Sequence, residues 1–187
     1  MTDLIAAAEA LQSLCEKQNW QFCIIGGLAL QYWGEQRLTR DVDLTLLTGF
    51  GSEADYIDLL ITGYKSRLPD AKAFALRNRV LLLETEDGIG IDISLGALPF
   101  EERVVNRSTY KEYLPERCLR ICTAEDLIVL KAFADRPLDW EDVSSILIKQ
   151  DSLDWDYIWE QLEPLVELKE APEILTKLSR YKSEIAQ

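Results

Sequence analysis

The feature that most constrains the fold of this chain is a change of pattern near residue 123. Before it, short runs that alternate apolar and polar residues, as strands do, interleave with stretches of helical spacing. After it only helical spacing remains, beginning with a capping-box pattern at Thr123 and Asp126. This order predicts an α/β or α+β fold in which helices flank a small mixed sheet. We expect a core over residues 1–122 and a helical C-terminal subdomain over residues 123–187.

The first part contains five short segments with strand character. Residues 40–47 alternate cleanly between apolar and polar side chains, and Asp87-Gly88 is a strong signal for a hairpin turn. The charged segment between Pro99 and Glu116 shows neither strand nor helix period, and we predict that it is irregular. The predicted strands cover residues 21–25, 40–47, 80–84, 89–95 and 117–122.

Histidine is absent from all 187 residues. Its absence excludes Ser-His-Asp and Cys-His catalysis and His-ligated zinc, so any acid–base step must use a carboxylate, Lys, Tyr or Cys. The 33 acidic and 20 basic residues give a formal net charge of −13. Such acidity argues against broad, sequence-blind binding to nucleic acid, which needs a cationic face, but it leaves room for a local basic pocket for a nucleotide.

The cysteines and the first residues indicate an intracellular protein. The four cysteines show neither C-x-x-C nor metal-site spacing, and we expect them to be reduced. Asp3 and Glu9 stand where a signal peptide would have positive charge and an apolar run. No stretch approaches the roughly 18 apolar residues of a membrane span. We therefore expect a soluble, cytoplasmic protein with no membrane partner.

Three aspartates are candidates for metal binding. Asp41 and Asp43 are two residues apart on one predicted strand and so point to the same face, roughly 7 Å apart at the backbone. Asp92 lies inside a second strand, between two isoleucines. If the two strands are neighbours, three carboxylates converge, and a divalent cation would remove their mutual repulsion. A half-exposed strand with a solvated acidic face is the alternative.

Gly26 and Gly27 stand between a predicted strand and a short helix. A double glycine at this point lets backbone N–H groups approach a phosphate without a Cβ in the way. A tight strand-to-helix turn without a ligand is the alternative.

Together these residues resemble a known family. The double glycine, a short helix and an Asp-x-Asp strand are similar to the signature of the DNA polymerase beta-type nucleotidyltransferase superfamily, and a later strand carboxylate completes it. Within the superfamily the chain looks closest to the AbiEii-type minimal nucleotidyltransferases, and the resemblance covers roughly residues 20–148. The residues that carry it are Ile25-Gly26-Gly27, Arg37, Thr39-Arg40-Asp41, Asp43, Asp92, Glu125-Asp126-Leu127, Lys131, Arg136, Asp139 and Asp142.

The resemblance implies a reaction and a set of roles. An NMP would move from an NTP to an acceptor hydroxyl, on tRNA or on a small hydroxylated molecule. Asp41 and Asp43 would hold two Mg²⁺ ions, and Asp92 would ligate the metal nearer the nucleophile and take the proton of the hydroxyl. Gly26 and Gly27 would seat the triphosphate. Members of the AbiEii-type group are often toxins of toxin–antitoxin or phage-defence pairs, which implies a cognate protein partner.

Three cations are candidates for binding the nucleotide. Lys131 is the only polar residue between Leu127 and Ala134, so it needs an anion, either a nucleotide phosphate or a carboxylate such as Asp139 or Asp142. Arg37 and Arg40 precede the carboxylates and would either reach phosphate or neutralise the acidic patch.

One position departs from the family pattern. Leu28 stands where many members have a Ser or Thr after the glycines, whose hydroxyl can meet a phosphate. Phosphate binding would therefore depend on backbone N–H groups and nearby cations.

Two other functions fit the same residues. Aminoglycoside and lincosamide nucleotidyltransferases share the signature, and a chain of charge −13 suits a cationic aminoglycoside better than a tRNA. The second alternative is a domain that binds a nucleotide or a protein partner without catalysis. The intact set of three aspartates weighs against that second alternative, and Leu28 weighs slightly for it.

Overall fold

The structure, a computed structural model, describes residues 2–185. The chain forms two compact units: unit 1 comprises Met1–Leu28 and Leu38–Cys122, and unit 2 comprises Ala29–Arg37 and Thr123–Gln187. Residues 29–37, which the sequence pattern assigns to the core, thus group with the C-terminal helices. Within the described residues no helix combines the length and the apolar character that a membrane crossing requires.

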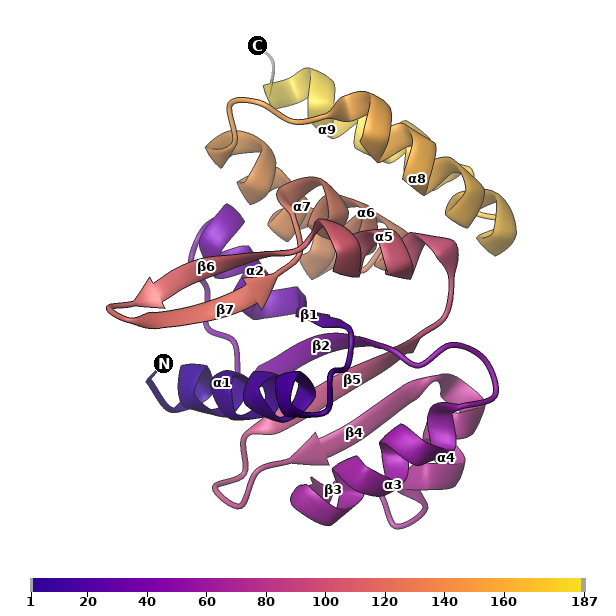
Figure 1. Cartoon of the computed structure of the whole chain (residues 1–187). Coiled ribbons are helices and arrows are strands. Elements are labelled where there is room, and N and C mark those ends of the chain that lie inside the picture. Colours follow the sequence, from indigo (N-terminus) through magenta and orange to yellow (C-terminus); the bar gives the residue numbers. More distant parts are fainter. Residues whose placement is uncertain (1, 186–187) are drawn as a thin grey trace. The chain divides into compact units, whose positions relative to one another are not determined.

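Unit 1 is built on a mixed seven-stranded sheet with the order β3-β4-β5-β2-β1-β7-β6 (Figure 1). The expected mixed sheet with flanking helices is confirmed, and all five expected strands are present within one residue at each end. The strands are β1 (Phe22–Ile24), β2 (Asp41–Leu47), β3 (Lys65–Ser66), β4 (Val80–Glu84), β5 (Gly90–Gly96), β6 (Thr109–Leu114) and β7 (Arg117–Ile121).

The parallel pair β2 and β5 lies at the centre of the sheet. Both strands alternate as the sequence predicts: Val42, Leu44, Ile91 and Ile93 are fully buried, and the residues between them form the other face. A parallel pair needs a crossover connection. Here the connection contains α3 (Glu53–Gly63), β3, α4 (Ala71–Asn78) and β4.

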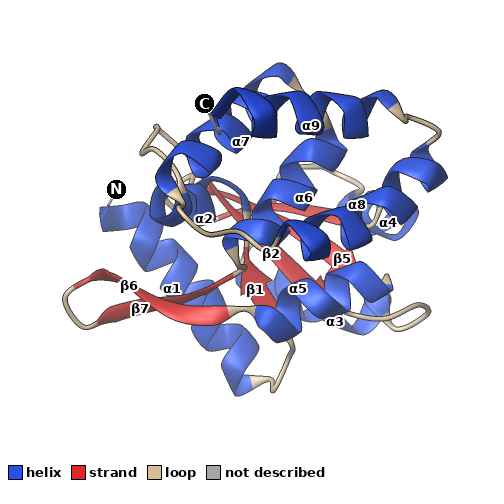
Figure 2. Cartoon of the chain, turned by 90° about the horizontal axis from the view of Figure 1, so that it is seen from above, coloured by secondary structure: helices blue, strands red, loops and turns tan. Residues whose placement is uncertain are grey.

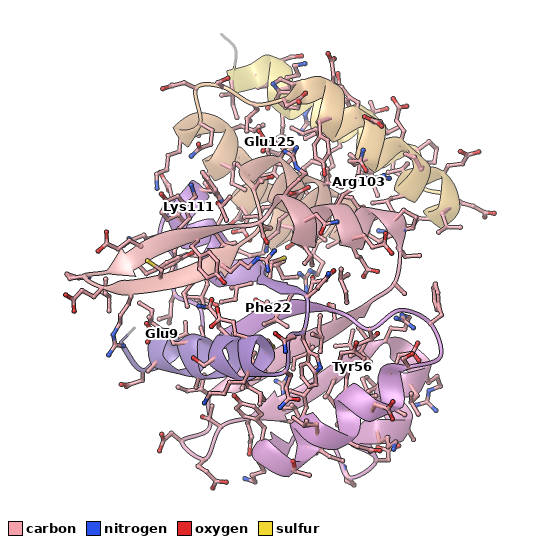
Figure 3. All side chains as sticks on the ribbon, in the orientation of Figure 1. Glu9, Phe22, Tyr56, Arg103, Lys111 and Glu125 are labelled. Atoms are coloured by element: carbon pink, nitrogen blue, oxygen red, sulfur yellow. The ribbon has the colours of Figure 1, made fainter. Side chains whose placement is uncertain are left out.

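Helices α1 (Thr2–Lys17) and α5 (Pro99–Arg107) pack on this sheet. The apolar stripe of α1, which includes Leu11 and Cys15, is buried. Arg120 of β7 joins the sheet to α5, because its guanidinium donates to the carbonyl of Val105 at 3.1 Å. The same guanidinium lies 5.8 Å from the ring centre of Phe22, which is labelled in Figure 3.

The prediction of an irregular segment between Pro99 and Glu116 is wrong, because the segment contains α5 and β6. Pro99 is the first residue of α5, and the carboxylate of Glu101 accepts the N–H groups of Ala97 and Leu98 at 2.8 Å each. The three buried apolar residues of α5 share one face, but a helix of nine residues is too short to establish a period in the sequence. Strand β6 is an edge strand with mostly exposed side chains and shows no alternation; its hairpin with β7 is visible in Figures 1 and 2.

Unit 2 is helical, as expected for the C-terminal residues (Figure 2). The predicted cap is confirmed, since Thr123 Oγ1 accepts the N–H of Asp126 at 3.2 Å. Residues 29–33 of α2 (Gly26–Trp33) also belong to this unit, and Lys149 Nζ donates to the Gly34 carbonyl at 2.9 Å. The remaining helices are α6 (Ala124–Ala134), α7 (Pro137–Lys149), α8 (Trp155–Lys169) and α9 (Glu173–Ile185).

Candidate functional site

The pairing of β2 and β5 places Asp43 directly opposite Asp92, with Asp41 opposite Gly90. Residues opposite each other on neighbouring strands share a face and are separated by about 4.8 Å at the backbone. Asp41, Asp43 and Asp92 therefore share one half-buried face of the sheet, as the alternating pattern predicts. Like charges directly opposite each other destabilise a sheet. Folding thus brings together carboxylates that need a nearby positive charge.

The turn after β1 is shaped around Asp43. Gly26 has a left-handed backbone with φ +61°, and a Cβ at this position would lie 2.6 Å from the Cβ of Asp43 and still closer to its carboxylate. The N–H of Gly27 donates to Asp43 Oδ2 at 3.3 Å. Gly26 is thus required by the approach of a carboxylate to the main chain. Space for a phosphate at the same turn stays a prediction.

Thr39 and Leu28 complete the surroundings of this turn. A Cβ on Gly27 would lie 2.7 Å from the Cβ of Thr39 and closer still to its hydroxyl, so the threonine side chain lies against the glycine. Leu28 is fully buried and its carbonyl accepts the hydroxyl of Tyr113 at 2.6 Å. The position that departs from the family pattern is therefore a core position here, and Thr39 provides the hydroxyl nearest the double glycine.

Arg67, which the sequence pattern does not single out, forms an ion pair with Asp92 through Nη2 and Oδ1. Its Nη1 is 3.4 Å from the point that a Cβ on Gly90 would occupy, and the Cγ of Asp41 is 2.9 Å from the same point. The absence of a side chain at Gly90 thus makes room for both groups. One cation from outside β2 and β5 therefore reaches the aspartate face.

The donor chemistry of this face fits a magnesium ion, which prefers carboxylate oxygens. Gly26 and Gly90 allow the carboxylates of Asp43 and Asp41 to lie against the backbone, in space that a side chain would fill. Across residues 2–185, however, no group of three or more Asp, Glu or Cys side chains could hold a metal ion as it stands. Rearrangement of the side chains would be needed to enclose an ion, because Asp92 is bonded to Arg67. Metal binding by the three aspartates stays a prediction.

In unit 2, Lys131 lies in a buried network of ion pairs. Its Nζ is 3.0 Å from Asp139 Oδ1 and 2.7 Å from Asp142 Oδ2, and all three side chains are less than 10% exposed. Arg37 binds Asp142 through two nitrogens, at 2.8 and 2.9 Å, and Arg136 binds Asp139 in the same way, at 2.6 and 3.1 Å. The carboxylate partners that the sequence allows for Lys131 are therefore present. Contact of Lys131 or Arg37 with a nucleotide stays a prediction.

The network also affects the ionisation of Asp139. Burial acts to raise the pKa of this carboxyl group, but hydrogen bonds from Arg136 and Lys131 outweigh the burial and bring the pKa below its usual value. Asp139 is thus held in its charged form. Arg40, the third candidate cation, is exposed in unit 1, and its role in binding a nucleotide also stays a prediction.

No family model and no curated protein matches the sequence. Among solved structures, the fold resembles that of the lincosamide antibiotic adenylyltransferase LnuA in its lincomycin-bound form. The TM-score is 0.50 and the identity 15%, over 73% of this chain and 92% of that one. It also resembles the antibiotic-resistance factor ANT(2'')-Ia, with a TM-score of 0.50 and 16% identity over 99% of this chain and 94% of that one. At these identities the likeness concerns the fold alone: the chain has the nucleotidyltransferase fold.

Proposed function

We propose that this chain is a magnesium-dependent nucleotidyltransferase that moves the NMP of an NTP to an acceptor hydroxyl, with pyrophosphate as the leaving group. The observation that carries the proposal is the register of β2 and β5. It puts Asp43 opposite Asp92, with Asp41 on the same face and a double glycine against Asp43. Acidic residues are disfavoured in strands, and opposed carboxylates destabilise a sheet, so a structural role does not explain the three together.

Each residue of the aspartate face has a role in this proposal. Asp41 and Asp43 would hold two Mg²⁺ ions, and Asp92 would hold the ion nearer the acceptor. Bound magnesium neutralises the charge that develops on the transferred phosphoryl group. The carboxylate of Asp92 would accept the proton of the attacking hydroxyl, in a chain that has no histidine to do so. The turn at Gly26 and Gly27 would position the triphosphate through its N–H groups.

The acceptor has two candidate classes. The net charge of −13 favours a small cationic molecule with hydroxyl groups, as in aminoglycoside modification, because an acidic surface attracts cations and repels a tRNA. The segment from Arg37 through Asp43 resembles the AbiEii-type signature. This resemblance instead favours tRNA as the acceptor and a role in a toxin–antitoxin or phage-defence pair. In that case a cognate partner or a local basic patch would have to receive the polyanion.

Transfer of label from an α-labelled NTP tests the proposal. The full chain is incubated with Mg²⁺, each NTP in turn, and either total tRNA or a panel of aminoglycosides and lincosamides. We expect label on one acceptor class and a loss of about 10²-fold or more in Asp41→Asn, Asp43→Asn and Asp92→Asn. Asp87→Asn, at an exposed turn in the same unit, is the matched control and should keep full activity.

The outcomes separate the alternatives. Label on tRNA supports the AbiEii-type role, and label on a small molecule supports drug modification. Tight nucleotide binding without transfer to any acceptor would favour a non-catalytic domain. Equal activity of Asp92→Asn and Asp87→Asn would refute the proposed site, because the substitution removes the same charge in both.

A further inference from the structure

The aspartate face contains a cation of its own. Arg67 Nη2 bonds to Oδ1 of Asp92, one of the oxygens that the proposed function assigns to a metal ion. Its guanidinium also approaches Gly90, beside the carboxylate of Asp41. Arg67 thus lies where a divalent ion shared by Asp41 and Asp92 would concentrate positive charge.

The position of Arg67 is fixed by the backbone. Arg67 directly follows β3, and its N–H donates to the carbonyl of Leu82 in β4 at 3.1 Å, which extends the β3–β4 ladder by one residue. Leu82 is in turn opposite Asp92 in the β4–β5 pair. The sheet therefore places Arg67 two strands away from Asp92, with Leu82 of β4 between them, and the long side chain of Arg67 covers this distance.

The ion pair compensates for the repulsion between Asp43 and Asp92. These two carboxylates are opposed in the parallel register, and a positive charge on one of them reduces the electrostatic penalty. The pair is only partly screened by solvent, since the side chain of Arg67 is 28% exposed and that of Asp92 35%. An arginine held in this way is a competitor for any cation that needs the same carboxylate.

We propose that Arg67 is a built-in counter-ion of the aspartate face, and that a divalent ion binds Asp92 only by displacing its guanidinium. The inference rests on the proposed function, because it concerns the same carboxylates. Arg67 then acts as a positioning residue. It holds Asp92 in place while the face is without a metal, and it sets the metal concentration at which the site fills.

The test is direct binding of Mn²⁺, measured by calorimetry and by the electron paramagnetic resonance signal of free Mn²⁺, without nucleotide. In Arg67→Met the competitor is removed, and we expect the Kd for Mn²⁺ to fall about threefold to fivefold. Lys72→Met is the matched control: it removes one positive charge from the same unit by breaking the exposed pair with Asp58. It should leave the Kd unchanged. Arg67→Lys keeps the charge and should stay close to the wild type.

The outcomes test the role of Arg67 separately from the metal site that the proposed function requires. If wild type binds Mn²⁺ and Asp41→Asn does not, the metal site exists. If, in addition, Arg67→Met binds Mn²⁺ no more tightly than wild type does, the inference about Arg67 is overturned and the proposed function is not. If Arg67→Met and Lys72→Met tighten binding equally, the effect is general electrostatics and the inference is again overturned. If neither wild type nor Arg67→Met binds Mn²⁺, the metal site is absent and both proposals fall.

Discussion

Replacing Gly26 by Ala should disturb the aspartate face directly. Two effects combine at this position. An alanine in the left-handed region, at φ +61°, is unfavourable by about 1–2 kcal/mol. In addition the new methyl group would lie 2.6 Å from the Cβ of Asp43, and rotation of the Asp43 side chain cannot move an atom that the strand backbone holds. Overpacking of this kind adds about 1–3 kcal/mol.

Gly49 provides the matched control for this substitution. Its φ is +68°, and no heavy atom in the described part of the chain lies within 4 Å of a Cβ at this position, leaving aside its own chain neighbours. Gly49→Ala therefore reports the backbone effect alone, about 1–2 kcal/mol of unfolding free energy. Gly26→Ala should lose about 2–5 kcal/mol in the same urea titration, followed by circular dichroism.

A double-mutant cycle identifies the cause of the difference. Asp43→Gly removes the three atoms nearest to the Gly26→Ala methyl group, so the penalty of Gly26→Ala should fall toward the Gly49→Ala value in that background. The reasoning is refuted if Gly26→Ala is no more destabilising than Gly49→Ala, or if Asp43→Gly leaves its penalty unchanged.

Two further predictions concern the buried network of unit 2. Lys131→Met leaves two buried carboxylates with one cation fewer, and it should lower the unfolding free energy by about 3 kcal/mol in urea. Lys177→Met, at a half-exposed pair, should lose less than about 1 kcal/mol, and equal losses would contradict a buried network. The pKa of Asp139 is depressed from 3.8 in the folded state, so its contribution to stability is present above that pH and is lost as pH falls below it. The stability difference between wild type and Arg136→Met should therefore be constant at neutral pH and shrink in acid titrations below pH 3.8; a difference independent of pH would contradict the ion pair.

The fold was largely accessible from sequence because its central strands have a clean period. Val42, Leu44 and Leu46 of β2 and Ile91, Ile93 and Leu95 of β5 are buried, and polar or small residues stand between them, so the sequence alternates over most of each strand. The sequence does not predict α5 or β3, which lack such a long alternating pattern. Helix α5 has nine residues with three buried apolar side chains, and β3 has only two residues, so neither is long enough to establish a period in the sequence.

The candidate site was accessible in part for a similar reason. Asp41 and Asp43 share a strand, so spacing alone fixes their common face. The position of Asp92 required the assumption of neighbouring strands, which the register bears out. Arg67 lies in the connection between β2 and β5, where no sequence motif marks it as a site residue. Only the pairing of β3 with β4 brings it to Asp92. For Lys131, hydrophobic surroundings implied an anionic partner, but the choice between carboxylate and phosphate depends on helix packing that periodicity does not encode.

The crossover between β2 and β5 has a consequence for how the protein is made. Asp43 and Asp92 meet only after α3, β3, α4 and β4 have been synthesised and folded back, because the two strands are neighbours in the sheet but not in the chain. Closing so long a connection is slow compared with forming a local hairpin. A nascent chain that ends before β5 therefore presents Asp41 and Asp43 without their counterpart. If the three aspartates bind a metal ion as proposed, they do so together only after β5 has left the ribosome.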